Sequence, residues 1–173
     1  MATQIVRMGL PPSGKSVAAL VALTLFLLHA HAQPSANPLA IKLIAEVELK
    51  TTEQGRETTK LMPADRVVPG DRLIYTLEVR NTAATTLPAP TVDTPVPTHM
   101  RYVTDSAAGP GTQVSYSVDG GQSFDVPENL KVAGPNGELR AAESADYTHI
   151  RWQFKSSLKA NSVAFVRFRA VAK

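Results

Sequence analysis

The chain has 173 residues with 18 Lys and Arg, 15 Asp and Glu and no Cys, so it has a formal net charge of +3 and forms no disulfide. Residues 1–32 hold two of the basic residues and none of the acidic ones, which leaves 16 basic and 15 acidic residues in the rest of the chain. This near balance gives no electrostatic case for binding nucleic acid.

Residues 1–32 are typical of a secretory signal peptide. Arg7 and Lys15 form a positive start, Val17–Leu28 is apolar, and Ala30-His31-Ala32 predicts cleavage after Ala32. The apolar segment has 12 residues, fewer than the roughly 20 that a membrane-spanning helix needs. We therefore expect a periplasmic or secreted protein with no stable membrane span after cleavage. A retained anchor is the alternative, and translation starting at Met1 or at Met8 fits the same pattern.

The segment GLPPSGKS, residues 9–16, matches the phosphate-loop pattern G-x-x-x-x-G-K-[ST]. That motif needs a buried strand before it and a helix of an α/β domain after it. Here only eight residues precede it, and the apolar part of the signal peptide follows. We interpret the match as accidental and expect no nucleotide binding.

The remaining chain divides into an extended leader, residues 33–40, and one domain, residues 41–173. The domain opens with alternating apolar and polar residues, which is typical of a half-buried strand. The predicted inward residues are Ile41, Leu43, Ala45, Val47 and Leu49. Ile44 falls on the polar face, and residues 51–60 form a polar connection with room for a short edge strand.

The next predicted strand, residues 72–80, follows a turn at Pro69-Gly70-Asp71. It alternates again, with Leu73, Tyr75, Leu77 and Val79 predicted to point inward. Residues 81–100 are rich in Pro, which excludes a helix and a central strand but allows a brief edge strand at 91–94. Residues 99–104 are predicted as another short strand.

The last third of the chain alternates in three further segments: 113–118, 149–154 and 162–172. Asp119-Gly120-Gly121 is typical of a tight turn toward a partner segment at 122–126. Residues 127–146 are predicted to form an excursion loop with a small hairpin at its tip. Together these patterns predict an all-β fold, an immunoglobulin-like antiparallel β-sandwich of about seven strands, preceded by the signal peptide.

The segment VVPGDRLIYTLEVRN, residues 67–81, resembles the opening of the bacterial family called domain of unknown function 11, a conserved repeat of exported and surface proteins. The family pattern V-x-P-G-D-x-[LV]-x-Y-x-[LI]-x-[VF]-x-N is filled by Val67, Pro69, Gly70, Asp71, Leu73, Tyr75, Leu77, Val79 and Asn81. A later stretch, PVPTHMRYVTDSA, resembles the family's prolines before a Y-V-x-x-S segment. The chain departs from the family at Ala83, where Gly is usual.

The resemblance spans about residues 41–173 and implies an immunoglobulin-like sandwich outside the cytoplasm. It implies structural roles for Pro69, Gly70, Asp71, Tyr75 and Asn81, in turns and in the core, and it implies no catalytic residue. We therefore expect an exported non-catalytic structural or protein-interaction domain of the bacterial envelope. Its expected partner is an envelope or surface protein, which would bind by edge-strand pairing.

No residues after position 32 form a recognisable catalytic or metal-binding set. His99 and His149 are isolated, whereas zinc sites need three or four clustered ligands. Asp119 and Asp125 resemble calcium ligands, but the spacing and the closing Glu of a calcium loop are missing, so a hairpin turn explains Asp119 better. There is no G-x-S-x-G elbow for a Ser nucleophile. We expect no enzyme activity, cofactor or metal.

A polysaccharide-binding module is the alternative function. It would need exposed aromatic rings in a groove, whereas Trp152, Tyr75, Tyr116 and Phe168 fall on predicted inward faces. The chain could also present a basic stripe to acidic polysaccharide or anionic lipid headgroups if neighbouring strands bring four cations together: Arg151, Lys155, Arg167 and Arg169. A solvated strand face is the simpler interpretation of these cations, as it is of Glu46 and Glu48.

Overall fold

The computed structural model describes residues 37–173, so the predicted signal peptide, the phosphate-loop match and the first half of the leader lie outside the described residues. The described part contains strands and one short 3₁₀ turn, η1 (Pro127–Asn129). The strands are β1 (Leu39–Glu53), β2 (Arg56–Pro63), β3 (Arg72–Asn81), β4 (Thr91–Pro95), β5 (Met100–Tyr102), β6 (Thr112–Ser117), β7 (Lys131–Ala133), β8 (Leu139–Ala141), β9 (His149–Phe154) and β10 (Val163–Ala172).

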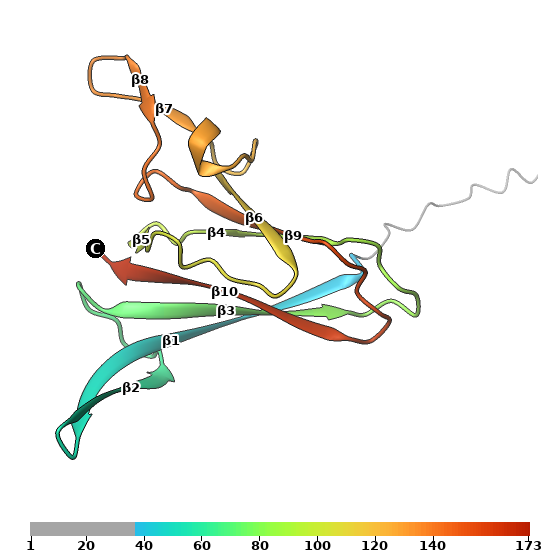
Figure 1. Ribbon diagram of the computed structural model, residues 1–173, viewed down its shortest axis with the longest axis horizontal. Helices are drawn as coiled ribbons and strands as arrows, with labels where there is room; N and C mark the ends of the chain where they lie inside the picture. The colour runs from blue at the N-terminus through green and yellow to red at the C-terminus, as the bar shows by residue number, and fades with distance from the viewer. Residues whose placement is uncertain (1–36) are drawn as a thin grey trace, which may run out of the picture. The chain divides into compact units, whose positions relative to one another are not determined.

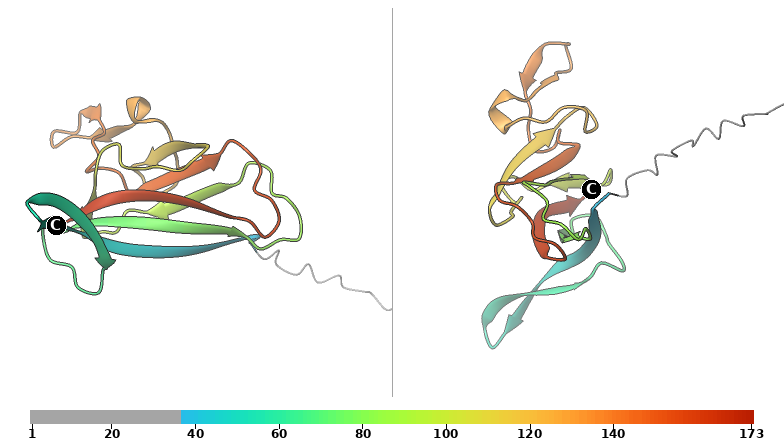
Figure 2. Two further views of the ribbon diagram at one scale, coloured as in Figure 1. Left: turned by 60° about the horizontal axis from the view of Figure 1, so that its bottom comes forward. Right: turned by 90° about the vertical axis from the view of Figure 1, so that its right-hand side faces the viewer.

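The strands form two facing antiparallel sheets, as the sequence predicts. One sheet has five strands in the order β2-β1-β3-β10-β5, and the other has three in the order β4-β9-β6. Figure 1 shows the two sheets as the layers of a sandwich. The predicted excursion loop is confirmed, because β7 and β8 form a separate hairpin within it. The β1–β2 and β7–β8 hairpins extend beyond the layers (Figure 2).

The core lies where β3 and β10 face β9, and large side chains fill it from both sheets. Trp152 of β9 is fully buried and meets Phe168 of β10, with 6.3 Å between ring centroids. Phe168 stacks on Tyr75 of β3 at 4.9 Å. Burying a side chain of this size contributes about 1.5–3 kcal/mol. The predicted inward positions of these aromatic residues are therefore confirmed, and Tyr116 is buried as well.

Three tyrosines form a second aromatic group inside the sandwich. Tyr116 stacks on Tyr147 at 4.4 Å, and its hydroxyl lies 2.9 Å from that of Tyr102. The Tyr102 hydroxyl also accepts a hydrogen bond from the backbone N–H of Ala107. Burial raises the pKa of the Tyr116 phenol well above its usual range, so the group stays neutral and serves packing.

The polar connection at residues 51–60, for which the sequence allows a short edge strand, forms a regular hairpin with the edge strand β2. Gln54 and Gly55 have φ values of 53° and 75°, which are typical of a two-residue type I′ turn. This turn extends β1 as far as Glu53 and pairs it with β2 over eight residues. Every residue of β2 except Thr58 is exposed. A strand with no buried face needs no alternation of apolar and polar residues, so its sequence gives little sign of a strand.

The inward face predicted for β1 is only partly buried. Val47 is buried and Ala45 is half-buried, but Ile41, Leu43 and Leu49 are 45%, 52% and 40% exposed. Their direction is correct, because Ile41 lies opposite the buried Val79 in the ladder with β3. The prediction that they are covered is wrong, because the opposing sheet has three strands and the sheet that carries β1 has five.

The turn before β3 joins the C-terminal strand to the start of the sheet. The backbone N–H of Val68 donates to Asp71 Oδ2 at 2.8 Å, and Gly70 has a φ of 94°, which favours glycine. The N–H of Gly70 donates to the carbonyl of Ala172, and the N–H of Ala172 donates to the carbonyl of Asp71. The Pro69-Gly70-Asp71 segment therefore fixes both the start of β3 and the end of β10.

Asn81, at the end of β3, has no exposed surface and joins two loops. Its Nδ2 donates to the carbonyls of Thr85, Leu158 and Lys159 at 2.8, 3.0 and 3.1 Å. Its Oδ1 accepts from the N–H of Ala83 at 2.9 Å. One side chain thus satisfies four backbone groups where the 82–90 and 155–162 loops meet.

We expect the Asn81→Ala variant to lose about 2–4 kcal/mol of unfolding free energy, because the Thr85 carbonyl and the Ala83 N–H lose their partner and the Leu158 and Lys159 carbonyls each lose one donor. The measurement is urea unfolding followed by circular dichroism. Asn129→Ala is the control, since the Asn129 amide is exposed and bonds only to Asp125, and it should cost less than about 0.5 kcal/mol. Equal losses in the two variants would contradict this role of Asn81.

Candidate functional site

The two histidines that the sequence singles out lie at different sheets. His99 comes just before β5 in the five-stranded sheet, whereas His149 begins β9 in the other. Within residues 37–173, no three His, Cys, Asp or Glu side chains gather closely enough to hold a metal ion.

Asp119 closes the predicted turn with its carboxylate. Its Oδ1 accepts from the N–H groups of Gln122 and Ser123, each at 3.0 Å, and from the Ser117 hydroxyl at 2.7 Å. Hydrogen bonds from Ser123, above all from its hydroxyl, hold the pKa of Asp119 well below the usual range. Asp125 instead accepts from Val126 N–H and Asn129 Nδ2. The two carboxylates thus stabilise separate stretches of loop.

The basic stripe that the sequence left open as an alternative does not form. Arg151 and Lys155 belong to β9 and the residues after it, in the three-stranded sheet, whereas Arg167 and Arg169 lie on β10 in the five-stranded sheet. Arg151 is neutralised by Asp93 through two hydrogen bonds of 2.7 Å, and its guanidinium lies 3.6 Å from the centre of the Phe124 ring. The cations are divided because β9 and β10 are neighbours in sequence but belong to different layers.

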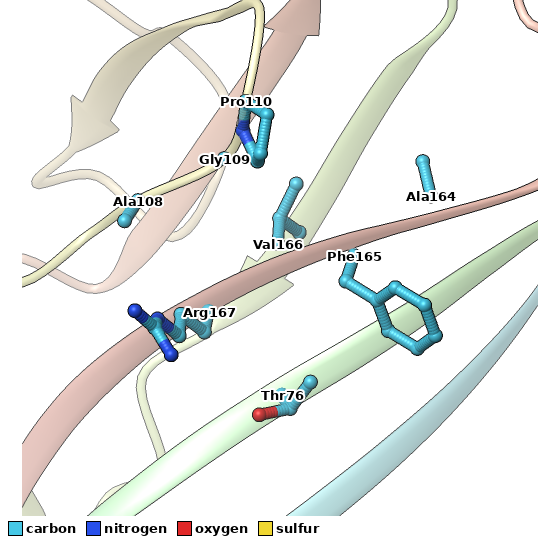
Figure 3. A pocket seen from close by; sticks show the side chains of 8 residues that line it. All are labelled: Thr76, Ala108, Gly109, Pro110, Ala164, Phe165, Val166 and Arg167. Atoms are coloured by element: carbon cyan, nitrogen blue, oxygen red, sulfur yellow. The ribbon is translucent and has the colours of Figure 1, made fainter.

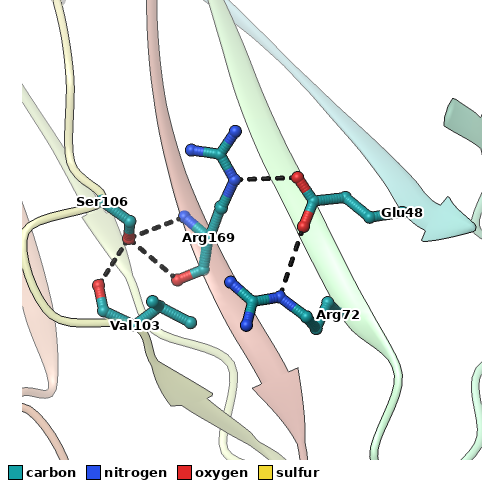
Figure 4. A network of polar contacts seen from close by, with 5 residues as sticks. All are labelled: Glu48, Arg72, Val103, Ser106 and Arg169. Atoms are coloured by element: carbon teal, nitrogen blue, oxygen red, sulfur yellow. Dashed lines mark hydrogen bonds and ion pairs between the residues drawn. The ribbon is translucent and has the colours of Figure 1, made fainter. Parts of the chain in front are cut away.

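Glu48 is also different from the solvated residue that the sequence predicts. Its side chain is 13% exposed and accepts hydrogen bonds from Arg169 Nε at 2.8 Å and Arg72 Nε at 3.5 Å (Figure 4). Beside it, the Ser106 hydroxyl donates to the Val103 carbonyl and accepts from Arg169 N–H. The network joins β1, β3 and β10 to the loop after β5.

The clearest opening in the described structure is the edge of β10 at residues 163–165. The backbone N–H and C=O of Arg167 both bond to Ala108, on the side of β10 away from β3. The backbone groups of successive residues on a strand point to opposite sides, so those of Val163 and Phe165 point to the same side as those of Arg167. β5 reaches only Ala170–Ala172, and no hydrogen bond from the described residues reaches these four groups. They are available to a further strand.

A recess of about 850 Å³ lies beside this edge. Its apolar lining comes from the loop that contains Gly109 and Pro110 and from Ala164, Phe165 and Val166 of β10 (Figure 3). The loop approaches β10 closely, because a Cβ on Gly109 would lie 2.7 Å from Val166 Cγ1. The Phe165 ring is 54% exposed at the rim. Sequence reasoning missed Phe165, although its position among the outward residues of β10 was the available signal.

Among residues 37–173, no helix combines the length and apolar character that a membrane crossing requires. Comparison of the chain with protein-family models, with curated proteins and with solved structures found no match. The resemblance to the domain of unknown function 11 family therefore stays a prediction, and the candidate site depends on geometry alone.

We expect the Glu48→Gln variant to lose about 1 kcal/mol of unfolding free energy, because two arginines lose their anionic partner. The loss should shrink in about 1 M NaCl, where ion pairs are screened. The control is Glu53→Gln, which removes a pair with Lys60 whose side chains are 55% and 60% exposed, and it should have little effect. Chemical unfolding at low and high salt measures both. A loss that is independent of salt would contradict the ionic role.

Proposed function

We propose that this protein is an exported, non-catalytic interaction domain of the bacterial envelope, related to the domain of unknown function 11 family, and that it binds an extended segment of a partner protein. Export is supported by the signal-like residues 1–32. The family relation is supported by the pattern over residues 67–81. The binding mode is supported by one observation above all, the open β10 edge beside an apolar recess.

Strand addition at residues 163–165 would use both parts of this site. The partner's backbone would pair with the N–H and C=O groups of Val163 and Phe165, which extends the sheet beyond β10. Side chains of an added strand alternate between its two faces, so one of them would reach the recess beside Val166 and Pro110. Backbone pairing supplies affinity in this mode, and the recess supplies selectivity.

Charge adds a second preference. Arg167 is exposed beside the recess, and no carboxylate of the described residues pairs with it, in contrast to Arg169 and Arg151. A partner segment with an apolar residue for the recess and a nearby Asp or Glu would therefore fit best.

Polysaccharide binding is the second candidate, and the exposed Phe165 ring is the observation that favours it. A sugar ring could stack on this phenyl ring while Arg167 binds a uronic acid carboxylate. However, Phe165 is the only large aromatic side chain of the described residues that is mainly exposed, so the protein partner is preferred.

The test is a pull-down from bacterial envelope extracts with the purified protein as bait, as the host processes it from the full-length chain, scored for proteins and glycans. We expect a protein partner that is lost in Val163→Pro, because proline removes an N–H that faces the open edge. Phe165→Ala should weaken capture about tenfold or more, since it removes part of the apolar rim.

The matched control is Thr59→Pro on the edge strand β2. The Ala64 N–H donates to the Ala45 carbonyl of β1. The backbone groups of alternate residues point to opposite sides of a strand, and Thr59 lies five residues before Ala64, so its N–H points away from β1. This variant should keep the partner. Capture that survives Val163→Pro, or an empty pull-down, would refute binding at β10. Glycan recovery that depends on Phe165 without any protein would instead support the polysaccharide module.

A further inference from the structure

The first half of β1 is a second open edge, on the opposite side of the same sheet. The ladder between β1 and β2 ends at Pro63, and the last backbone bond there runs from Ala64 N–H to the Ala45 carbonyl. The backbone groups of successive residues on a strand point to opposite sides, so the N–H and C=O groups of Ile41 and Leu43 point to the same side as those of Ala45. This is the side on which β2 pairs further along β1. No hydrogen bond from residues 37–173 reaches these four groups.

This edge also carries uncovered apolar surface. Ile41 and Leu43 are 45% and 52% exposed, although they lie opposite the buried Val79 and Leu77 of β3. Open backbone groups and apolar side chains thus coincide at Ile41 and Leu43 of the segment 39–43, in which the Leu39 N–H donates to Asn37 Oδ1 at 3.0 Å. Such a segment is a ready template for pairing with another strand.

We propose that residues 39–43 pair with the same residues of a second copy of this chain, antiparallel about a two-fold axis at Ile41. Such an isologous contact uses one surface twice, as in most dimers. Ile41 lies opposite Ile41 of the second copy, and Leu43 lies opposite Leu39. The two five-stranded sheets become one sheet that continues through both molecules.

Charge and space both select this register. Pairing about Ile41 sets Lys42 opposite Ala40 of the second copy, whereas pairing Ile41 with Leu43 would set the two Lys42 side chains opposite each other. Pairing about Leu43 would place the incoming Ile41 beside Ala45, where Ala64 already binds. In the selected register, the ladder ends after Leu43, because the carbonyl of Ala45, the next residue that faces the edge, already accepts from Ala64 N–H.

The absence of Cys from the chain allows a direct test by a single substitution. In the proposed dimer, Ile41→Cys places two thiols opposite each other with about 5.5 Å between Cα atoms. That spacing lies within the roughly 4.4–6.8 Å range of disulfides. We expect mild oxidation to give a covalent dimer on a non-reducing gel. Leu49→Cys is the matched control, because this residue is 40% exposed on the same face but its backbone pairs with β2, and it should give no covalent dimer on the same gel.

Sedimentation equilibrium of the protein without added cysteines gives the second measurement. We expect a reversible monomer–dimer equilibrium whose dissociation constant rises at least about tenfold in Ile41→Lys and is unchanged in Leu49→Lys. A protein that stays monomeric, a dimer that tolerates Ile41→Lys, or more efficient linkage through Leu43→Cys than through Ile41→Cys would each overturn the proposal. Loss of partner capture at β10 moves none of these results, so the two interactions are tested separately.

Discussion

The unequal size of the two sheets is the constraint on which the rest of this structure depends. Three strands, β4-β9-β6, face a sheet of five, β2-β1-β3-β10-β5, so only part of the larger sheet is covered. The largest buried side chains, Trp152 and Phe168, lie where the layers overlap. Outside the overlap, residues with the same inward direction remain in water, as Ile41 and Leu43 do. The position of the core and the exposed apolar surface of β1 have the same cause.

A sandwich without disulfides must hold its strand ends by hydrogen bonds and charge pairs, and the recognisable sequence pattern falls at those positions. Asn81 binds two loops at one end of β3, and the Pro69-Gly70-Asp71 turn binds the end of β10 at the other. The Glu48 network ties three strands and the loop after β5 on the outer face. These residues specify how β3 connects to its neighbours, which explains why the pattern predicts a fold and says nothing about a ligand.

Alternation in the sequence predicted the fold class and the direction of most side chains, because a two-residue period follows from strand geometry. It correctly placed Leu73, Tyr75 and Phe168 inside. It did not show which inward residues are covered, since coverage of Ile41 depends on the width of another sheet. It grouped Arg151 with Arg169 because adjacency in sequence does not reveal the layer. The open edge at Phe165 could not be predicted either, because it depends on where the chain after β5 leaves β10.

Both open edges arise in the same way: a neighbouring strand ends before the strand that it pairs with. β2 ends at Pro63 and leaves the first half of β1 free, while the chain that continues from β5 last bonds to β10 between Ala108 and Arg167 and leaves the start of β10 free. Their surroundings differ, because a loop forms a recess beside β10, whereas β1 presents the exposed side chains of Ile41 and Leu43. A recess can select one side chain of an unlike partner, whereas an exposed apolar edge with a self-matching register favours its own copy. In either case the incoming strand completes a ladder and leaves the overlap of the two sheets unchanged.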